Sequence, residues 1–104
     1  MRPLLIALIA ATIAAPSFAA DHPGAVVYRT KMCKACHGDD GSGNTPAGKT
    51  VQAHDLRSEA VQKKSDQELM ATITNGKGKM PSFKSSLKAE QIRDVVGYIR
   101  TLKK

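Results

Sequence analysis

Two cysteines and a histidine stand close together in this chain, and their spacing predicts one kind of chemistry. Cys33, Cys36 and His37 form a Cys-x-x-Cys-His sequence, which is the attachment signature of c-type haem. Within one helical turn, positions i, i+3 and i+4 share a face, so both thiols and the imidazole would point the same way. Each thiol can then form a thioether with a haem vinyl group, and the imidazole can bind the iron. The pattern predicts one covalent haem c.

This cysteine pair has two other conceivable uses, and both fit the sequence less well. A thioredoxin-like redox pair needs a βαβ pattern, but no strand-like run precedes Cys33 and a turn-rich stretch, residues 38–44, follows the motif. A structural zinc site normally has four protein ligands, and His22 and His54 stand at no recognisable spacing from the cysteines. Haem attachment is therefore the favoured interpretation.

Nucleotides and nucleic acids are not expected as ligands. Residues 43–50 match the phosphate-loop pattern G-x-x-x-x-G-K-T, but that pattern has meaning only between a buried strand and a helix. The residues before it are polar and rich in glycine, so we expect a turn there. The chain also has no dense basic run with interleaved aromatic residues.

The first 19 residues have the layout of a secretory signal peptide. Met1 and Arg2 give a positive start, residues 4–15 are apolar, and Ser17-Phe18-Ala19 is a small-x-small cleavage site. The apolar run is shorter than the roughly 20 residues that span a bilayer, so no stable membrane anchor is expected; the alternative is an uncleaved helix at the membrane surface. We expect residues 1–19 to be removed and residues 20–104 to form one domain in the periplasm.

The mature chain is small and basic. Removal of residues 1–19 leaves 85 residues and lowers the net charge from +7 to +6, because Arg2 leaves with the signal. A chain of this size buries only about 60% of its unfolded surface and usually needs a metal, disulfides or a cofactor. Two cysteines cannot build a disulfide framework, so the haem is expected to complete the core.

The remaining sequence predicts an all-α domain, and no run is typical of a strand. Helices are expected from about Pro23 to the attachment turn, near 58–63, from a Ser65–Glu68 capping box to Gly76, and from near Ala89 onward. A loop rich in glycine and proline, roughly residues 38–48, follows the attachment turn. The last helix is expected to bury residues spaced by three and four: Ile92, Val95, Val96, Ile99 and Leu102.

A second iron ligand is expected among the methionines. Met80 lies 43 residues after His37, in a Gly-rich loop closed by Pro81, and can reach the opposite haem face. The proline also holds Met80 extended. His54 or an open coordination site are the alternatives. The other methionines are less suitable: one leaves with the signal, one abuts the attachment turn, and one fits a helical core pattern (Met1, Met32 and Met70).

These motifs together resemble the small class I cytochromes c, particularly the bacterial monohaem and c6-like ones. The resemblance covers nearly the whole mature chain. It rests on Cys33–Gly38, on Asn75–Phe83, and on a terminal amphipathic helix that ends in Tyr98–Leu102. It implies a compact all-α fold of three to five helices around one covalent haem.

The resemblance also implies roles for single residues. In such proteins the methionine of the Met-Pro pair is the second axial ligand, which here is Met80. The carbonyl of the loop proline, here Pro46, is expected to accept a hydrogen bond from His37 Nδ1. Such a bond would fix the ring and strengthen it as an iron ligand.

Two features depart from the family pattern. The family places an aromatic residue four positions before the first cysteine, but Tyr28 stands five before Cys33, with Gly24 four before Tyr28. This extra residue leaves the packing of the first helix open. Lys88 stands where a serine or threonine would cap the last helix, so its start is expected to fray or to shift by a residue or two.

The expected ligand pair leads to a predicted function. With His37 and Met80 both bound to iron, no position is left for oxygen or substrate, and the thioether ligand raises the reduction potential. We therefore expect a soluble periplasmic carrier of single electrons and not an enzyme. The alternatives are a haem-based small-ligand binder or sensor, and the cytochrome subunit of a larger oxidoreductase complex.

Several lysines cluster in the sequence around the two ligand segments: Lys34, Lys49, Lys77, Lys79 and Lys84. They can serve to steer redox partner proteins with an acidic docking surface, or they can simply form a solvated surface. The chain is expected to be a monomer.

Overall fold

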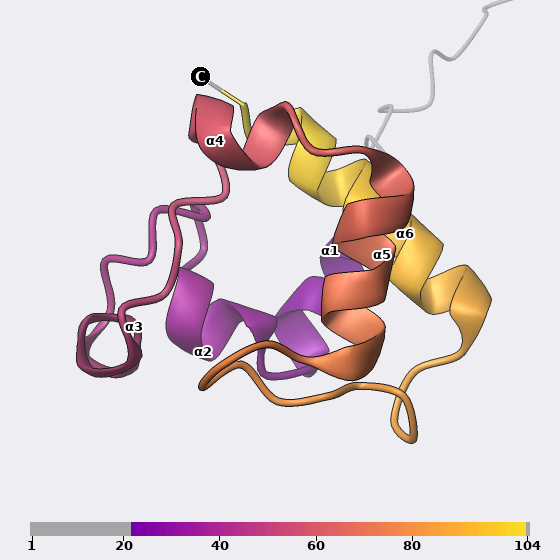
Figure 1. Cartoon of the computed structure of the whole chain (residues 1–104), viewed down its shortest axis with the longest axis horizontal. Coiled ribbons are helices and arrows are strands. Elements are labelled where there is room, and N and C mark those ends of the chain that lie inside the picture. The colour runs from indigo at the N-terminus through magenta and orange to yellow at the C-terminus, as the bar shows by residue number, and fades with distance from the viewer. Residues whose placement is uncertain (1–21, 104) are drawn as a thin grey trace, which may run out of the picture.

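A computed structural model describes residues 22–103 of the protein, so the predicted signal peptide lies outside the described residues. Within that range the chain forms six helices (Figure 1): α1 (Pro23–Thr30), α2 (Cys33–His37), α3 (Pro46–Val51), α4 (Glu59–Gln62), α5 (Asp66–Asn75) and α6 (Ala89–Thr101). No residue of 22–103 lies in a strand, and the one β-type pairing there is an isolated bridge between Lys77 and Met80. The all-α class is confirmed, with more helices than the expected three to five.

The most extensive contact between elements joins α1 to α6. Gly24 permits the close approach, because a Cβ at this position would collide with the carbonyl oxygen of Asp94. One turn later, the ring of Tyr28 packs edge-on against that of Tyr98, with 5.2 Å between the ring centroids. The Gly24 and Tyr28 pair therefore packs against the last helix, although its distance from the attachment motif differs from the family pattern.

The extra residue before Cys33 is accommodated by a break in the first helix. α1 ends at Thr30, Lys31 is extended, and α2 begins at Cys33 after Met32. The helix expected from about Pro23 to the attachment turn therefore begins as predicted and ends at Thr30, three residues before Cys33. On the two sides of the break, α1 packs on α6 and α2 packs on α3.

The last two helices, α5 and α6, begin where the sequence predicts. The Ser65 side chain accepts a hydrogen bond from the Glu68 amide at 3.1 Å and caps α5, which ends before Gly76 at φ +75°. The last helix begins at Ala89 as expected. The shift expected from Lys88 at the cap position is not found, and the Gln91 side chain accepts a hydrogen bond from the backbone amide of Lys88 at 2.8 Å.

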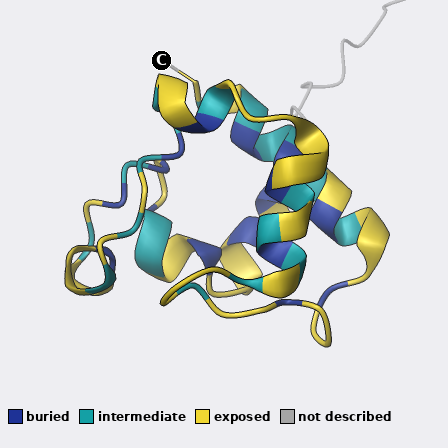
Figure 2. Cartoon of the chain, viewed as in Figure 1, coloured by how far each residue is buried: buried dark blue, intermediate teal, exposed yellow. Residues whose placement is uncertain are grey.

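The predicted buried face of α6 is confirmed for Ile92, Val95, Val96 and Ile99, whereas Leu102 is only half-buried. Figure 2 shows exposed residues on the outer faces of α5 and α6 and buried residues where the two helices meet. α4 is shorter than the predicted helix near 58–63 and is capped by the Ser58 side chain, which accepts from the Val61 amide at 3.4 Å.

The segment expected to be a loop over residues 38–48 ends in an unpredicted helix, α3. The Thr45 hydroxyl caps it by accepting a hydrogen bond from the Gly48 amide at 2.8 Å. A Cβ at Gly48 would collide with the Cys36 carbonyl oxygen, so this glycine lets α3 lie directly against α2. The phosphate-loop match thus falls on an irregular segment and a short helix with no strand before it among residues 22–103.

Candidate cofactor site

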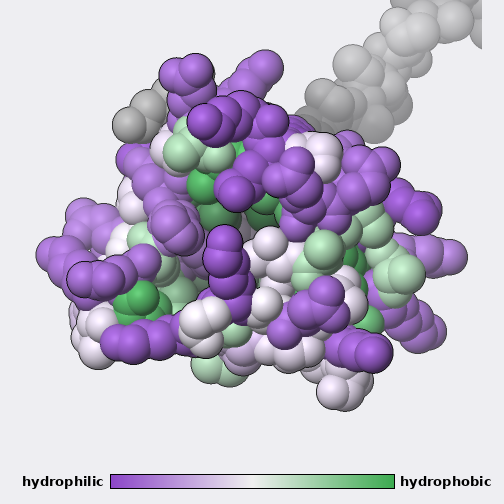
Figure 3. Space-filling model, viewed as in Figure 1, coloured by the Kyte–Doolittle hydropathy of each residue, from purple (hydrophilic) through white to green (hydrophobic). Residues whose placement is uncertain are grey.

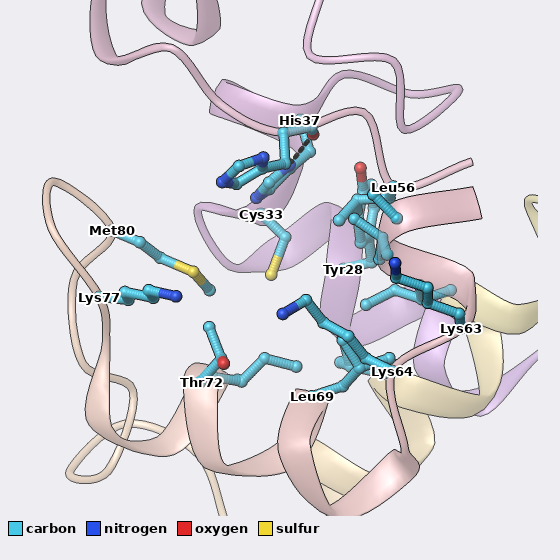
Figure 4. A pocket seen from close by; sticks show the side chains of 16 residues that line it. Tyr28, Cys33, His37, Leu56, Lys63, Lys64, Leu69, Thr72, Lys77 and Met80 are labelled. Carbon is cyan, nitrogen blue, oxygen red and sulfur yellow. Dashed lines mark hydrogen bonds between the residues drawn. The ribbon is translucent and has the colours of Figure 1, made fainter. Parts of the chain in front are cut away.

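Two adjoining cavities of about 380 Å³ each lie at the centre of the ring of helices. Cys33, His37 and Met80 line both cavities, and Cys36 lines the second. Figure 3 shows apolar residues in a recess surrounded by hydrophilic ones. In Figure 4 the Cys33 side chain points into the space that the His37 and Met80 side chains also border. The structure therefore brings all four sequence-predicted site residues together.

The attachment helix α2 is held by hydrogen bonds to a carbonyl in its middle and to that of its C-terminal cap, Gly38. The Tyr28 hydroxyl donates to the Gly38 carbonyl at 2.6 Å, and the Thr45 hydroxyl lies 2.7 Å from the Ala35 carbonyl. Burial raises the pKa of the Cys33 thiol to about 11. A thioredoxin-like pair would need a βαβ unit, whereas the described residues 22–103 form helices.

The His37 ring is oriented by a backbone carbonyl. Its Nδ1 lies 3.0 Å from the His54 carbonyl oxygen, and because a carbonyl can only accept, Nδ1 carries the proton and donates it. The lone pair is therefore on Nε2, the nitrogen that remains for a metal. Burial lowers the pKa of His37 and keeps the imidazole neutral, which is the form that binds iron.

The prediction that the Pro46 carbonyl accepts the hydrogen bond from His37 is wrong. Pro46 is the first residue of α3, and its carbonyl accepts a hydrogen bond from the Thr50 hydroxyl at 3.0 Å. After α3 the chain turns through Gln52, in the left-handed region at φ 55°, and this turn brings the next segment back to His37. The sequence gives no sign that the His54 carbonyl holds His37, because a residue of any type has a backbone carbonyl.

Met80 is positioned by a tight turn fastened to α5. Lys77 and Met80 exchange two backbone hydrogen bonds, of 3.1 and 2.9 Å, around Gly78 at φ +57°. Beyond the turn, the Phe83 amide donates to the Ile73 carbonyl at 3.0 Å, and the Ser82 hydroxyl donates to the Thr74 carbonyl at 2.6 Å. The loop therefore presents Met80 at a fixed place on the cavity wall.

The other candidate ligands are less well placed. Met32 is 64% exposed at the edge of the second cavity, and Met70 packs against the core as expected. His22 caps α1 by accepting from the Gly24 amide at 3.0 Å, so it is committed elsewhere. Within residues 22–103 no three histidine, cysteine or acidic side chains could hold a metal together, which disfavours a zinc site. His54 lines both cavities and remains an alternative ligand.

The cavity walls match a large apolar group that also carries negative charge. Six leucine, isoleucine and valine side chains line the first cavity: Leu56, Val61, Leu69, Ile73, Val95 and Ile99. Lys63, Lys64 and Lys77 line it too, and none of the lining residues is acidic. A haem is a flat apolar ring with an iron and two carboxylates. Each of its parts has a matching group in the site. The two thiols and the apolar walls match the ring, the imidazole and the thioether match the iron, and the lysines match the carboxylates.

Comparisons with known proteins agree with this geometry. The family model described as Cytochrome C oxidase, cbb3-type, subunit III, matches residues 19–99. A cytochrome c6 of Nostoc sp. is 36% identical over 94 residues, which are 90% of this chain and 82% of the relative. The solved structure of the KustC0563 c-type cytochrome has a TM-score of 0.71 and 32% identity, and the match covers 78% of this chain and 98% of that chain. The chain belongs to the class I c-type cytochromes.

Another cytochrome also matches the chain, and membership of this family defines the cofactor. A cytochrome c6 of Gloeothece citriformis is 38% identical over 85 residues, which cover 81% of this chain and 74% of the relative. As a c-type cytochrome the chain carries one covalently bound haem c with its iron, and it is an electron-transfer protein rather than an enzyme. Among the described residues, no helix is long and apolar enough to cross a membrane.

Proposed function

We propose that this cytochrome is a periplasmic electron carrier with His/Met axial ligation. In this proposal Cys33 and Cys36 attach the haem, and His37 and Met80 bind the iron. One observation carries the proposal: Met80 is 43 residues away from His37 in sequence, yet both line the same two cavities as Cys33.

The bound haem would supply a one-electron couple at its iron, and the surrounding residues would suit it to electron transfer. The His54 carbonyl holds the His37 ring through Nδ1, and the paired hydrogen bonds of the 77–80 turn hold Met80. Two ligands fixed in this way need to move little when the iron changes oxidation state. With both axial positions filled, oxygen and small substrates have no position at which to bind.

Export and docking belong to the same proposal. Residues 1–19 would act as a cleaved signal peptide, which delivers the chain to the periplasm. Lys77 and Lys79 are exposed and line the second cavity, which no acidic residue lines. We propose that they steer an acidic redox partner to the haem, and that the carrier works as a monomer.

Carbon monoxide binding separates a carrier from a small-ligand binder. We expect the reduced, haem-loaded protein to keep its visible spectrum under carbon monoxide, because Met80 blocks the sixth position. Met80→Ala should bind carbon monoxide, whereas Met70→Ala should behave as the parent. A parent protein that binds the gas readily would favour the sensor or ligand-binder alternative.

A second candidate function is a subunit of a larger oxidoreductase complex. It is favoured by the description of the matching family model, which names an oxidase subunit. The proposed monomer predicts that the native protein elutes from a sizing column at the mass of one haem-loaded chain. Stable co-purification with a larger redox enzyme would instead support the subunit role.

A further inference from the structure

Two neighbouring lysines at one end of the first cavity have no partner of opposite charge. Lys63 and Lys64 line the cavity and make no ion pair within residues 22–103. Figure 4 shows the ammonium group of Lys64 directed into the cavity. Both lysines are exposed, and no acidic residue lines the cavity, so this end of the cavity carries uncompensated positive charge, which favours an anion there.

The position of this lysine pair fits one part of the haem. Lys63 and Lys64 directly follow α4, and Figure 1 shows α4 across the ring from α2, which carries the attachment cysteines. In haem c the two propionate carboxylates lie on the edge of the macrocycle opposite the two thioether positions. A ring attached at α2 that extends across the cavity would therefore bring its carboxylates toward the segment after α4.

Arg100 of α6 holds this segment in place. It donates hydrogen bonds to the carbonyl oxygens of Gln62 at 2.8 Å and of Lys64 at 2.5 Å. The Gln62 side chain adds bonds to the carbonyls of Leu56 at 2.7 Å and Ile99 at 3.0 Å. The backbone that carries the two lysines is thus tied to α6, which packs against both α1 and α5.

Arg100 also pairs with a nearby acidic residue that could otherwise pair with the lysines. Asp66 lies two residues after Lys64, and its Oδ1 accepts hydrogen bonds from two nitrogens of the Arg100 guanidinium, at 3.0 and 2.8 Å. An acid engaged in this way is not free to pair with Lys64. Arg100 therefore leaves the lysines available for another carboxylate.

We propose that Lys63 and Lys64 form the carboxylate-binding end of the cavity and pair with the haem propionates, with Arg100 as their positioning residue. This inference rests on the proposed function, because it assumes haem attachment at Cys33 and Cys36. Charge-assisted hydrogen bonds between ammonium and carboxylate are short and strong. The paired cations balance the propionate charges, which favours the reduced iron and raises the potential.

The test compares Lys63→Gln/Lys64→Gln in the haem-loaded chain with Lys88→Gln, which removes a positive charge at the start of α6, outside both cavities. We expect the double variant to lower the midpoint potential by about 28 mV or more. At 59 mV per tenfold, this is an about threefold change in the equilibrium constant for one-electron exchange. The propionate bending bands in its resonance Raman spectrum should shift. Lys88→Gln should change neither, and Lys63→Arg/Lys64→Arg should keep the parent potential.

Arg100→Lys tests the positioning role, because it keeps the charge but loses the planar fork of donors. We expect it to lower the potential in the parent and to have no further effect in the Lys63→Gln/Lys64→Gln background. Equal shifts in the two backgrounds would show that Arg100 acts independently of the lysines and would overturn its assigned role.

The visible spectrum of the parent separates failure of this inference from failure of the proposed function. A parent without thioether-linked haem would overturn both. With normal haem attachment, a double lysine variant whose potential or propionate bands match those of Lys88→Gln would overturn the lysine assignment alone.

Discussion

The α1–α6 pair and the segments from α2 to α4 contribute to the core in different ways. α1 and α6 pack on each other directly, through the close approach at Gly24 and the edge-on contact of Tyr28 with Tyr98. The segments from α2 to α4 border the central cavities and are joined to each other by hydrogen bonds to backbone carbonyls, such as that of His54 with His37 and that of Ala35 with Thr45. Figure 1 shows the two regions as opposite parts of one ring.

This difference indicates which part of the fold depends on the cofactor. The helix pair is held by its own direct contact, although Val95 and Ile99 also border the cavity. Leu56 and Val61 border the cavity too, and α4, which contains Val61, makes no extensive contact with another described helix. We therefore expect the helix pair to be the self-sufficient part and the α2–α4 region to require the haem.

The largest effect is expected from loss of the haem. Cys33→Ser/Cys36→Ser, prepared without haem, should show no cooperative thermal melt and reduced helix content by circular dichroism, because about 60% burial leaves a chain of this size little reserve. The haem-loaded parent, melted under the same conditions, is the control. A native-like cooperative melt of the haem-free variant would show that the polypeptide folds without its cofactor and that the two regions do not differ in this way.

The next largest effect is expected at the contact between α1 and α6. Gly24→Ala places a Cβ against the Asp94 carbonyl oxygen, so it should lower the free energy of unfolding by about 1–3 kcal/mol, as overpacking does. Gly97→Ala is the matched control in α6, because its Cβ would meet only the His22 ring, at 3.3 Å. There, the gain in helix propensity, up to about 1 kcal/mol, should leave stability unchanged or raised. Denaturant melts of the haem-loaded variants check both, and equal losses would contradict this packing.

Tyr28 joins the two regions, and its hydroxyl can be removed without altering the ring packing. Tyr28→Phe removes one of two donors to the buried Gly38 carbonyl, which keeps the Gly41 amide at 3.2 Å, and should lower the free energy of unfolding by about 1 kcal/mol. Tyr98→Phe removes a hydroxyl from the partner ring, which makes no hydrogen bond within residues 22–103, and should cost much less. If the two variants melt alike, the bond to Gly38 does not hold α2 in place.

The smallest effects are expected on partner docking, and they should be confined to the cavity side. Lys77→Glu/Lys79→Glu should slow electron transfer to an acidic partner severalfold through association, and added salt should lower the parent rate as the Debye length falls from about 10 Å at 0.1 M to about 3 Å at 1 M. Arg93→Glu, on the exposed face of α6, should have little effect. A parent rate that does not respond to salt in stopped-flow measurements would favour a merely solvated lysine surface.

The sequence predicted the parts of the fold that local patterns determine. The α5 cap at Ser65 and the apolar face of α6 depend on spacing and capping within one segment, and both are found in the structure. The four site residues were proposed from the cysteine motif and the Met80-Pro81 pair, and the structure brings their side chains to one place.

The parts that sequence reasoning missed depend on contacts between distant segments. The His54 carbonyl and the Arg100 bonds to Gln62 and Lys64 involve backbone oxygens, which every residue has and no motif reveals. The break after Thr30 has a similar origin, because it depends on how α1 meets α6 and α2 meets α3 rather than on a helix-breaking residue.

The proposed ligand pair can be tested most directly by the near-infrared absorption of the oxidised, haem-loaded protein. Sulfur bound to ferric haem iron gives a charge-transfer band in this region. We expect the band in the parent and in Met70→Ala and its loss in Met80→Ala, with a substantial fall in potential, since axial ligation spans roughly 0.8 V among haem proteins. A band that survives in Met80→Ala and disappears in Met70→Ala would contradict the assignment of Met80 as the iron ligand.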